Sequence, residues 1–229
     1  MITRPITLIA MAGLLLGFGS AHSYADECPT PAEPVIQVKL LAPAAATNPS
    51  LSRAEITERS KQQSQGEWEE WRVSLGRTEI ELSYDMDASA ATAGDGHGGY
   101  CAAIAAVEVA VRLKTTKYIA SELVPGTCMY DAVSQHEERH VQVIRRYQSQ
   151  IEERLRRAIS ATARRPAQAP TPSEGVVTVK GDLWTVVKDT METLVVALGR
   201  DQAPLDTPES YDEPRKICGE AAYNAAFAN

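Results

Sequence analysis

The chain has few aromatic residues and histidines, and it has fewer basic than acidic residues. Only two phenylalanines and four histidines occur among its 229 residues, and aromatic residues make up 6% of the total. Acidic residues outnumber basic residues by 30 to 23, which gives a formal net charge of −7. Because contact with phosphate groups needs a basic surface, this composition argues against a nucleic-acid-binding protein.

Several catalytic signatures are also missing. The sequence has no G-x-S-x-G nucleophile motif and no glycine-rich loop of the kind that holds phosphate groups. The four cysteines, at positions 28, 101, 128 and 218, are widely spaced and form no C-x-x-C pair, which argues against a cysteine-based zinc site. In an exported chain, an even number of cysteines predicts two disulfides, and the spacing leaves all three pairings open.

A long apolar run occurs only at the beginning of the chain. It extends from about Ile6 to Phe18, follows Arg4, and gives way to small and polar residues up to Ala25. The run is shorter than the ~20 residues of a membrane-spanning helix. It is typical of a signal peptide in residues 1–25 that is cleaved before Asp26. We therefore expect a secreted or periplasmic protein of a bacterial cell envelope, with no spanning segment after cleavage. Nothing in the sequence indicates its oligomeric state.

The remainder divides into a lead-in and one domain. Residues 26–66 are rich in proline, alanine and polar residues, and they predict a loosely packed segment with a short helix beginning near Ser50 or Ser52. In residues 67–229, apolar and polar residues alternate around 80–84 and again at 107–113, which predicts two half-buried strands separated by a small, glycine-rich loop at 88–101. The sequence KTTK at 114–117 then predicts a turn into a further strand at 118–123.

Two long helices follow the predicted strands. The first begins with Thr127 as its N-cap and extends to about Arg164, where a proline-rich segment interrupts it. Its apolar face has a spacing of three and four residues and includes two histidines. The residues of this face are Met129, Val133, His136, His140, Ile144, Tyr147, Ile151, Leu155 and Ile159. A second helix is expected at about 181–198. Strands followed by helices predict an α+β fold with a small antiparallel or mixed sheet.

The sequence HEERH at 136–140 matches the motif H-E-x-x-H. Residues four apart on a helix lie on the same face, so His136 and His140 can converge on one Zn²⁺ ion. Glu137 then projects beside the metal, where it can accept a proton from the attacking water. Two histidines on a buried face without a shared partner would carry a desolvation penalty, which a bound metal removes. We therefore predict zinc ligation by His136 and His140, with Glu137 as the general base.

On this motif and the preceding strands, residues 100–143 resemble the zincin metallopeptidases, and in particular the predicted secreted zinc-dependent proteases of bacteria. The resemblance implies a zincin-like domain in residues 67–229 that hydrolyses peptide bonds in a peptide or protein substrate. It also implies that a strand at the sheet edge, here 117–123, holds the substrate. Val143 and Arg146 stand where the metzincin subgroup has glycine and histidine, and the aspzincin pattern is absent. The alternative is a non-catalytic envelope protein that uses the same fold to bind metal or a partner.

The third zinc ligand stays open in the sequence. A catalytic zinc site needs three protein ligands and one position for water. His97 lies in the glycine-rich loop, and Glu192 lies beside the apolar face of the second helix, as the gluzincin glutamate does. The segment after that helix offers Asp206, Glu209 and Asp212, within which we select Glu209 as the candidate.

Overall fold

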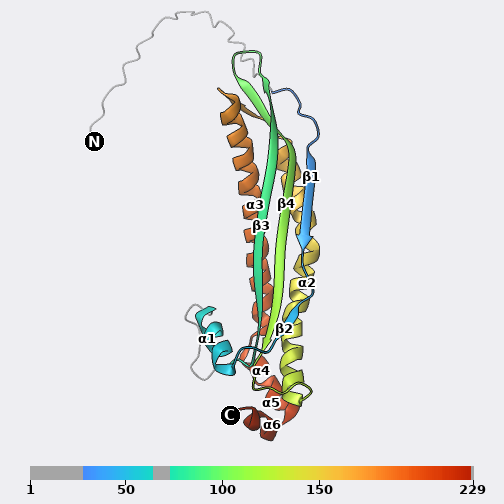
Figure 1. Cartoon of the computed structure of the whole chain (residues 1–229), viewed down its shortest axis with the longest axis vertical. Helices are drawn as coiled ribbons and strands as arrows, with labels where there is room; N and C mark the ends of the chain where they lie inside the picture. The colour runs from blue at the N-terminus through green and yellow to red at the C-terminus, as the bar shows by residue number, and fades with distance from the viewer. Residues whose placement is uncertain (1–27, 64–72, 228–229) are drawn as a thin grey trace, which may run out of the picture.

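The computed structural model describes residues 28–63 and 73–227, and it has a mixed α+β fold (Figure 1). The predicted signal peptide and the predicted domain boundary at 66/67 lie outside the described residues. The strands are β1 (Val35–Leu41), β2 (Ala46–Asn48), β3 (Gly76–Gly94), β4 (Tyr100–Ile119) and β5 (Ala167–Ala169). The helices are α1 (Arg53–Gln63), α2 (Cys128–Ala163), α3 (Pro172–Gln202), the 3₁₀ turn η1 (Ala203–Leu205), α4 (Pro208–Tyr211), α5 (Glu213–Cys218) and α6 (Glu220–Phe227).

The long strand β4 is the centre of the sheet. β3 pairs with it in antiparallel orientation along its whole length. Its other edge is paired in turn with β5, β1 and β2, of which β1 and β2 run parallel to β4. A strand of 19 residues, such as β3, spans about 60 Å. The β3–β4 hairpin therefore determines the length of the molecule (Figure 1).

One face of this sheet is covered by α2 and α3, and the other face is open to solvent. Along β4, Val107, Val109, Val111 and Leu113 are buried in the main core with the apolar faces of both helices. The side chains between them point to the open face, where cross-strand ion pairs join β4 to its neighbours. Lys114 pairs with Glu81 at 2.8 Å, and Arg112 pairs with Asp85. The predicted alternation of buried and exposed residues is confirmed for these strands.

The predicted ends of the strands are wrong. β3 continues to Gly94 and β4 begins at Tyr100, so the predicted loop at 88–101 is reduced to a short turn. KTTK is no turn, because β4 continues through it to Ile119 while Thr115 pairs with Ile80 and Lys117 pairs with Thr78. Lys117 and Tyr118 also pair with Thr47 and Asn48 of β2, so these two residues lie in the middle of the sheet. The expectation that 117–123 is an edge strand available to a substrate is therefore wrong.

The beginning and the end of α2 agree with the sequence prediction. Its N-cap is Thr127, whose hydroxyl accepts a hydrogen bond from the backbone N–H of Tyr130, and its C-cap is Arg164. The part of the predicted apolar stripe from Ile144 to Ile159 is buried in the main core with the sheet and α3, whereas Met129 and Val133 lie in a second core. Two side chains of α2 also cap the outer edge of β1: Glu152 accepts a hydrogen bond from the N–H of Leu40, and Arg156 donates one to a β1 carbonyl. These contacts satisfy backbone groups that would otherwise be exposed at a sheet edge.

The second long helix begins and ends outside its predicted bounds. It starts at Pro172, with Thr171 as N-cap, and ends at Gln202 instead of extending over 181–198. Gly175 lies inside this helix. A Cβ atom at this position would lie 2.8 Å from the Cβ of Ala102, so glycine allows α3 to pack closely on β4. Glycine therefore serves helix–sheet packing here.

The predicted lead-in contributes to the sheet. β1 and β2 both lie within residues 26–66, and the expected short helix is α1. Val38 is buried and its neighbours Gln37 and Lys39 are exposed, which is the alternation expected of a strand. The prolines around this segment make the strand difficult to recognise in the sequence. Two disulfides, Cys28–Cys101 and Cys128–Cys218, confirm the predicted number and settle the pairing. In the described part of the chain, no helix is both long and apolar enough to cross a membrane.

Candidate metal centre

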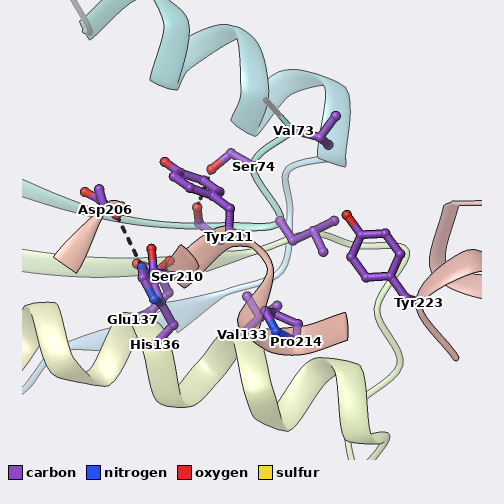
Figure 2. A pocket seen from close by; sticks show the side chains of 12 residues that line it. Val73, Ser74, Val133, His136, Glu137, Asp206, Ser210, Tyr211, Pro214 and Tyr223 are labelled. Atoms are coloured by element: carbon purple, nitrogen blue, oxygen red, sulfur yellow. Dashed lines mark hydrogen bonds and ion pairs between the residues drawn. The ribbon is translucent and has the colours of Figure 1, made fainter. Parts of the chain in front are cut away.

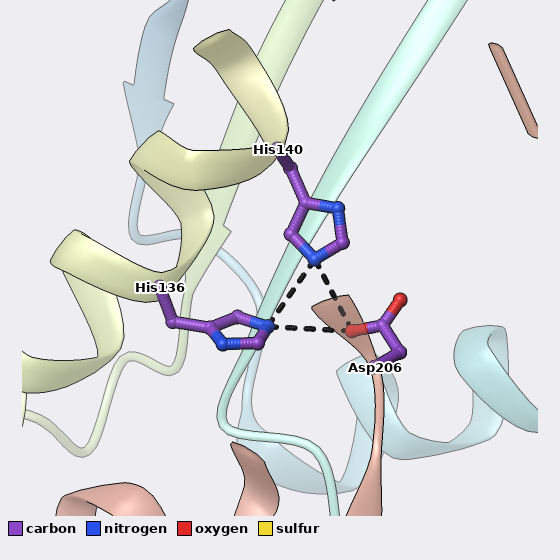
Figure 3. A group of neighbouring side chains, drawn as sticks. All are labelled: His136, His140 and Asp206. Atoms are coloured by element: carbon purple, nitrogen blue, oxygen red, sulfur yellow. Dashed lines mark hydrogen bonds and ion pairs between the residues drawn. The ribbon is translucent and has the colours of Figure 1, made fainter. Parts of the chain in front are cut away.

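The two histidines of the motif lie one turn apart near the beginning of α2. Their rings are 5.0 Å apart between centroids, and their Nε2 atoms are 3.2 Å apart (Figure 3). His140 is buried, with 7% of its surface exposed, and the His136 side chain is 14% exposed. The helical spacing therefore directs both Nε2 atoms to one point, as the motif predicts.

Asp206 places a carboxylate oxygen at the same point as the two Nε2 atoms. It follows η1 directly, so α3 and η1 bring it across to α2 (Figure 3). Its Oδ1 atom lies 3.1 Å from Nε2 of His140 and 3.3 Å from Nε2 of His136. These three side chains are the group of potential metal ligands found among the described residues.

The dimensions of this group fit a zinc ion. Zinc binds nitrogen and oxygen at about 2.0–2.2 Å, and tetrahedral geometry then separates neighbouring ligand atoms by about 3.3–3.6 Å. The three observed separations, 3.1, 3.2 and 3.3 Å, are close to the short end of this range. A site of two histidines and one carboxylate also leaves a fourth position for water, as catalytic zinc sites do.

Protons alone satisfy this triangle poorly. Each Nε2 atom of His136 and His140 has one site in the ring plane, which holds either a proton or a lone pair. Each of these atoms nevertheless has two close partners in the triangle. A cation between the three atoms accepts all three lone pairs at once. The donor set therefore favours a metal over a simple hydrogen-bond network.

The outer nitrogens of the two rings have different partners. Nδ1 of His140 contacts Oε1 of Gln202, the last residue of α3, which fixes a proton on Nδ1 and leaves Nε2 as the ligand atom. Nδ1 of His136 instead accepts a hydrogen bond from Arg139 at 3.0 Å, because a guanidinium has no acceptor. A neutral His136 that binds metal through Nε2 carries its proton on Nδ1. Arg139 must then turn towards Glu213, which already accepts from both of its terminal nitrogens.

The charges within the group are strongly coupled. Partial burial raises the pKa of Asp206, but hydrogen bonds from His136 and His140 outweigh it and hold the pKa well below its usual range. Burial lowers the pKa of His140, but the hydrogen bond and charge of Asp206 outweigh burial and raise the pKa above its ordinary value. The carboxylate is thus ionised and directed at the two imidazoles, as a metal ligand must be.

Glu137 is buried between α2 and the first residues of β3. Only 3% of its surface is exposed, and Oε2 accepts a hydrogen bond of 2.7 Å from the hydroxyl of Thr78. Burial raises the pKa of Glu137, although the neighbouring histidines and Thr78 act in the opposite direction. A carboxylate whose pKa is raised is better able to accept a proton near neutral pH.

A pocket adjoins His136, Asp206 and Glu137 (Figure 2). Its lining residues come from the beginning of β3, from α2 and from the segment after α3. They are Val73, Ser74, Leu75, Gly76, Val133, His136, Glu137, Asp206, Ser210, Tyr211, Pro214 and Tyr223. The candidate metal centre is therefore reached through a pocket between three segments of the chain.

The other predicted candidates for the third ligand lie outside the group. Glu209 is exposed in the first turn of α4, and Asp212 forms ion pairs with two basic residues of α5. Glu192 pairs with Lys188 at 3.2 Å on the exposed side of α3. His97 lies in the turn between β3 and β4, at the other end of the hairpin from Thr78, which contacts Glu137. The structure thus brings Asp206, and not Glu209, to the two histidines.

Sequence reasoning did not identify Gln202, Thr78 or Arg139 as parts of the site. Thr78 and Gln202 contact α2 from segments that are distant in sequence, and Arg139 is a polar helix residue whose contact with His136 the motif does not indicate. The only sequence signal for Asp206 was its place in the acidic segment that follows α3. No protein-family model, no curated protein and no solved structure matches the chain, so its function must be argued from the geometry of this site.

Proposed function

We propose that the chain is a zinc-dependent hydrolase of peptide bonds with a zincin-like domain. The observation that carries the proposal is the convergence of His136, His140 and Asp206 at mutual distances of 3.1–3.3 Å beside the buried Glu137. Two disulfides, and no spanning helix in the described residues, are compatible with the proposed location outside the cytoplasm.

His136, His140 and Asp206 would hold the metal, with Gln202 orienting the ring of His140. A zinc ion in such a site supplies Lewis-acid chemistry: it polarises a carbonyl oxygen and lowers the pKa of water towards ~7. Glu137 accepts the proton of the attacking water and passes it to the leaving amine. The hydroxyl of Thr78, bonded to Oε2, keeps the Glu137 carboxylate in place for these transfers.

The first test is the metal itself. Zinc content is measured by inductively coupled plasma mass spectrometry on the purified chain and on His140→Ala, after both are dialysed against equal, low zinc. We expect about one zinc ion per wild-type chain and a large loss in the variant. Equal zinc content in the two proteins would refute the metal site.

The second test separates metal binding from catalysis. Glu137→Gln keeps the size of the side chain but cannot accept the proton, so we expect it to retain zinc and to lose at least about 10²-fold in the rate of peptide hydrolysis. Glu138→Gln is the matched control, because Glu138 is the next residue and pairs with Lys117 of β4, outside the group of His136, His140 and Asp206. A wild-type chain that binds zinc and cleaves no peptide would support the alternative, a metal-binding module without catalysis.

A further inference from the structure

The two outer edges of the sheet differ in how they are covered. On one side, Glu152 and Arg156 of α2 bind backbone groups of β1 and close that edge. On the other side, β3 pairs with β4 and, among the described residues, with no further strand. Its pairing with β4 is regular as far as the irregularity between Ser89 and Ala90. The outer edge of β3 therefore presents a row of backbone N–H and C=O groups that no described strand pairs.

The core-facing side chains of β3 are only half-buried along this edge. Tyr84 and Met86 pair across the sheet with Val111 and Val109 of β4. The two valines are completely buried, whereas Tyr84 and Met86 pack at the margin of the main core and stay partly exposed. The core is thus incompletely covered on the side of β3 that has no neighbouring strand.

The side of α3 next to this edge carries exposed apolar residues. Val177, Trp184 and Val195 are exposed by 71%, 44% and 47%, and their spacing places them on one side of the helix, which we call the α3 flank. The ring of Trp184 lies 5.6 Å from the ring of Tyr84 between centroids, so the α3 flank adjoins β3. Figure 1 shows α3 at the outer side of β3 over the upper half of the molecule.

The widths of the two layers explain why the α3 flank is uncovered. At the level of Tyr84 the described sheet has three strands, because Tyr84 pairs with Val111, and Val111 pairs with Leu40 of β1. Three strands at a spacing of ~4.8 Å cover about 14 Å. Two helices side by side, each about 10 Å in diameter, cover about 20 Å. The difference is close to the width of one strand, so one strand added beside β3 would cover the α3 flank.

The open face of β3 carries a row of acidic side chains. Glu81, Asp85 and Asp87 form this acidic row, and the side chains of Glu81 and Asp85 are exposed by 68% and 70%. Lys114 and Arg112 of β4 pair with Glu81 and Asp85 from one side. Basic residues on the outer side would continue the alternation of charge across the strands. A second copy of β3 in this position would place like charges beside one another, which destabilises a strand pair.

We propose that residues 80–88 of β3 and the α3 flank bind a partner protein, which adds an extended segment to the sheet as a further strand. The segment alternates apolar and basic residues: the apolar side chains pack on Tyr84 and Trp184, and the basic side chains lie beside the acidic row. The surface is centred on Tyr84, which is about 20 Å along β3 from Thr78, the residue that contacts Glu137. The partner is therefore bound away from the candidate metal centre, and its binding does not depend on zinc.

The test uses three labelled peptides of about nine residues with blocked ends. The first alternates lysine and valine, the second has the same composition with all lysines before all valines, and the third alternates glutamate and valine. Fluorescence anisotropy measures their binding to the disulfide-bonded wild-type chain in the presence of a chelator. We expect the alternating lysine–valine peptide to bind at least about tenfold more tightly than the other two, because it alone combines the pattern and the charge.

Three results would overturn the proposal. Equal binding of the two lysine–valine peptides would mean that charge alone attracts them to an acidic chain. Binding that requires zinc in place of the chelator would place the peptide at the candidate metal centre. No binding of any peptide would also contradict the partner, and a chain that then sediments as a dimer would assign the edge to a second copy.

A charge reversal in the acidic row provides a second measurement. We expect Asp87→Lys to weaken binding of the alternating lysine–valine peptide at least about tenfold and to strengthen binding of the glutamate–valine peptide. Asp189→Lys is the matched control, because it makes the same change in net charge at an exposed position of α3 outside the α3 flank. Equal effects of the two substitutions would contradict a local contact with β3. The wild-type comparison of the three peptides remains decisive if Asp87→Lys does not fold.

Discussion

At the scale of single residues, His140 would connect the protonation of the proposed site to metal binding. A proton and a metal ion would compete for its Nε2 atom. Burial lowers the pKa of His140, but Asp206 outweighs burial and raises the pKa above the ordinary 6.5. Above this pKa, Nε2 has a free lone pair, and the affinity for zinc should not depend on this group. Below it, the proton must leave first. We therefore expect the zinc dissociation constant to increase up to about tenfold for each unit that the pH falls below the pKa.

Competition with a chromophoric chelator between pH 5.5 and 8.5 would measure this dependence. Asp206→Asn removes the charge that raises the pKa of His140, so we expect the onset to move to lower pH in addition to a general loss of affinity. Glu209→Gln is the control, because Glu209 lies nearby in sequence and outside the group of three ligands. An affinity that does not change across the whole pH range would contradict a role for His140 as a ligand.

Some residues of this site could be predicted from the sequence, and others could not. His136, Glu137 and His140 could be identified because one helical turn determines their geometry, and the surrounding apolar stripe showed which side of α2 they occupy. Asp206 is 66 residues from His140, and its position depends on how α3 packs and where η1 ends. Sequence alone could restrict the third ligand to a few acidic residues but could not choose among them.

At the scale of elements, the close approach of β3 to α2 positions Glu137. Gly76 makes this approach possible: a Cβ atom there would lie 2.6 Å from Oε1 of Glu137 and 2.7 Å from Val133. Because both neighbours are buried, we expect Gly76→Ala to lower the free energy of unfolding by about 1–3 kcal/mol, as overpacking does. Displacement of Glu137 should also reduce hydrolysis beyond the loss of folded protein.

Gly94→Ala is the matched control, because it lies in the same strand and a Cβ atom there meets nothing within 4 Å. Urea unfolding followed by circular dichroism should show a change within about 0.5 kcal/mol for this variant. Equal destabilisation by the two substitutions would mean that the effect reflects strand propensity, and not contact with Glu137.

The elements themselves were only partly predictable from the sequence. Alternation identified the middle of β3 and β4, because one face of the sheet is open and carries charged residues. It failed at KTTK, where polar residues resemble a turn, although Thr115 is buried and Lys114 is exposed as the strand continues. It also failed at 88–94, because alanine, serine and threonine fit a loop as well as they fit a strand that β4 holds in place.

At the scale of the whole molecule, the candidate metal centre joins two parts that are distant in sequence. α2 provides His136 and His140, and the segment that follows α3 provides Asp206. A metal that binds the folded chain and not the unfolded chain stabilises it by mass action, by about 2.7 kcal/mol at a concentration 100 times the dissociation constant. For a domain of this size, this corresponds to an increase in Tm of about 5–10 °C. We therefore expect zinc to raise the Tm of the chelator-treated protein by this amount.

Differential scanning calorimetry with and without zinc would measure the shift, with both disulfides intact in every sample. Asp206→Asn should lose most of the shift, whereas Glu209→Gln should keep it, since Asp206 alone of the two contacts the histidines. Magnesium should have little effect on the wild-type chain, because its preferred ligands are oxygen atoms in octahedral geometry, and this group offers two imidazole nitrogens. The same Tm with zinc and with chelator would show that no ion joins α2 to the segment after α3, and the hydrolase proposal would fail with the metal site.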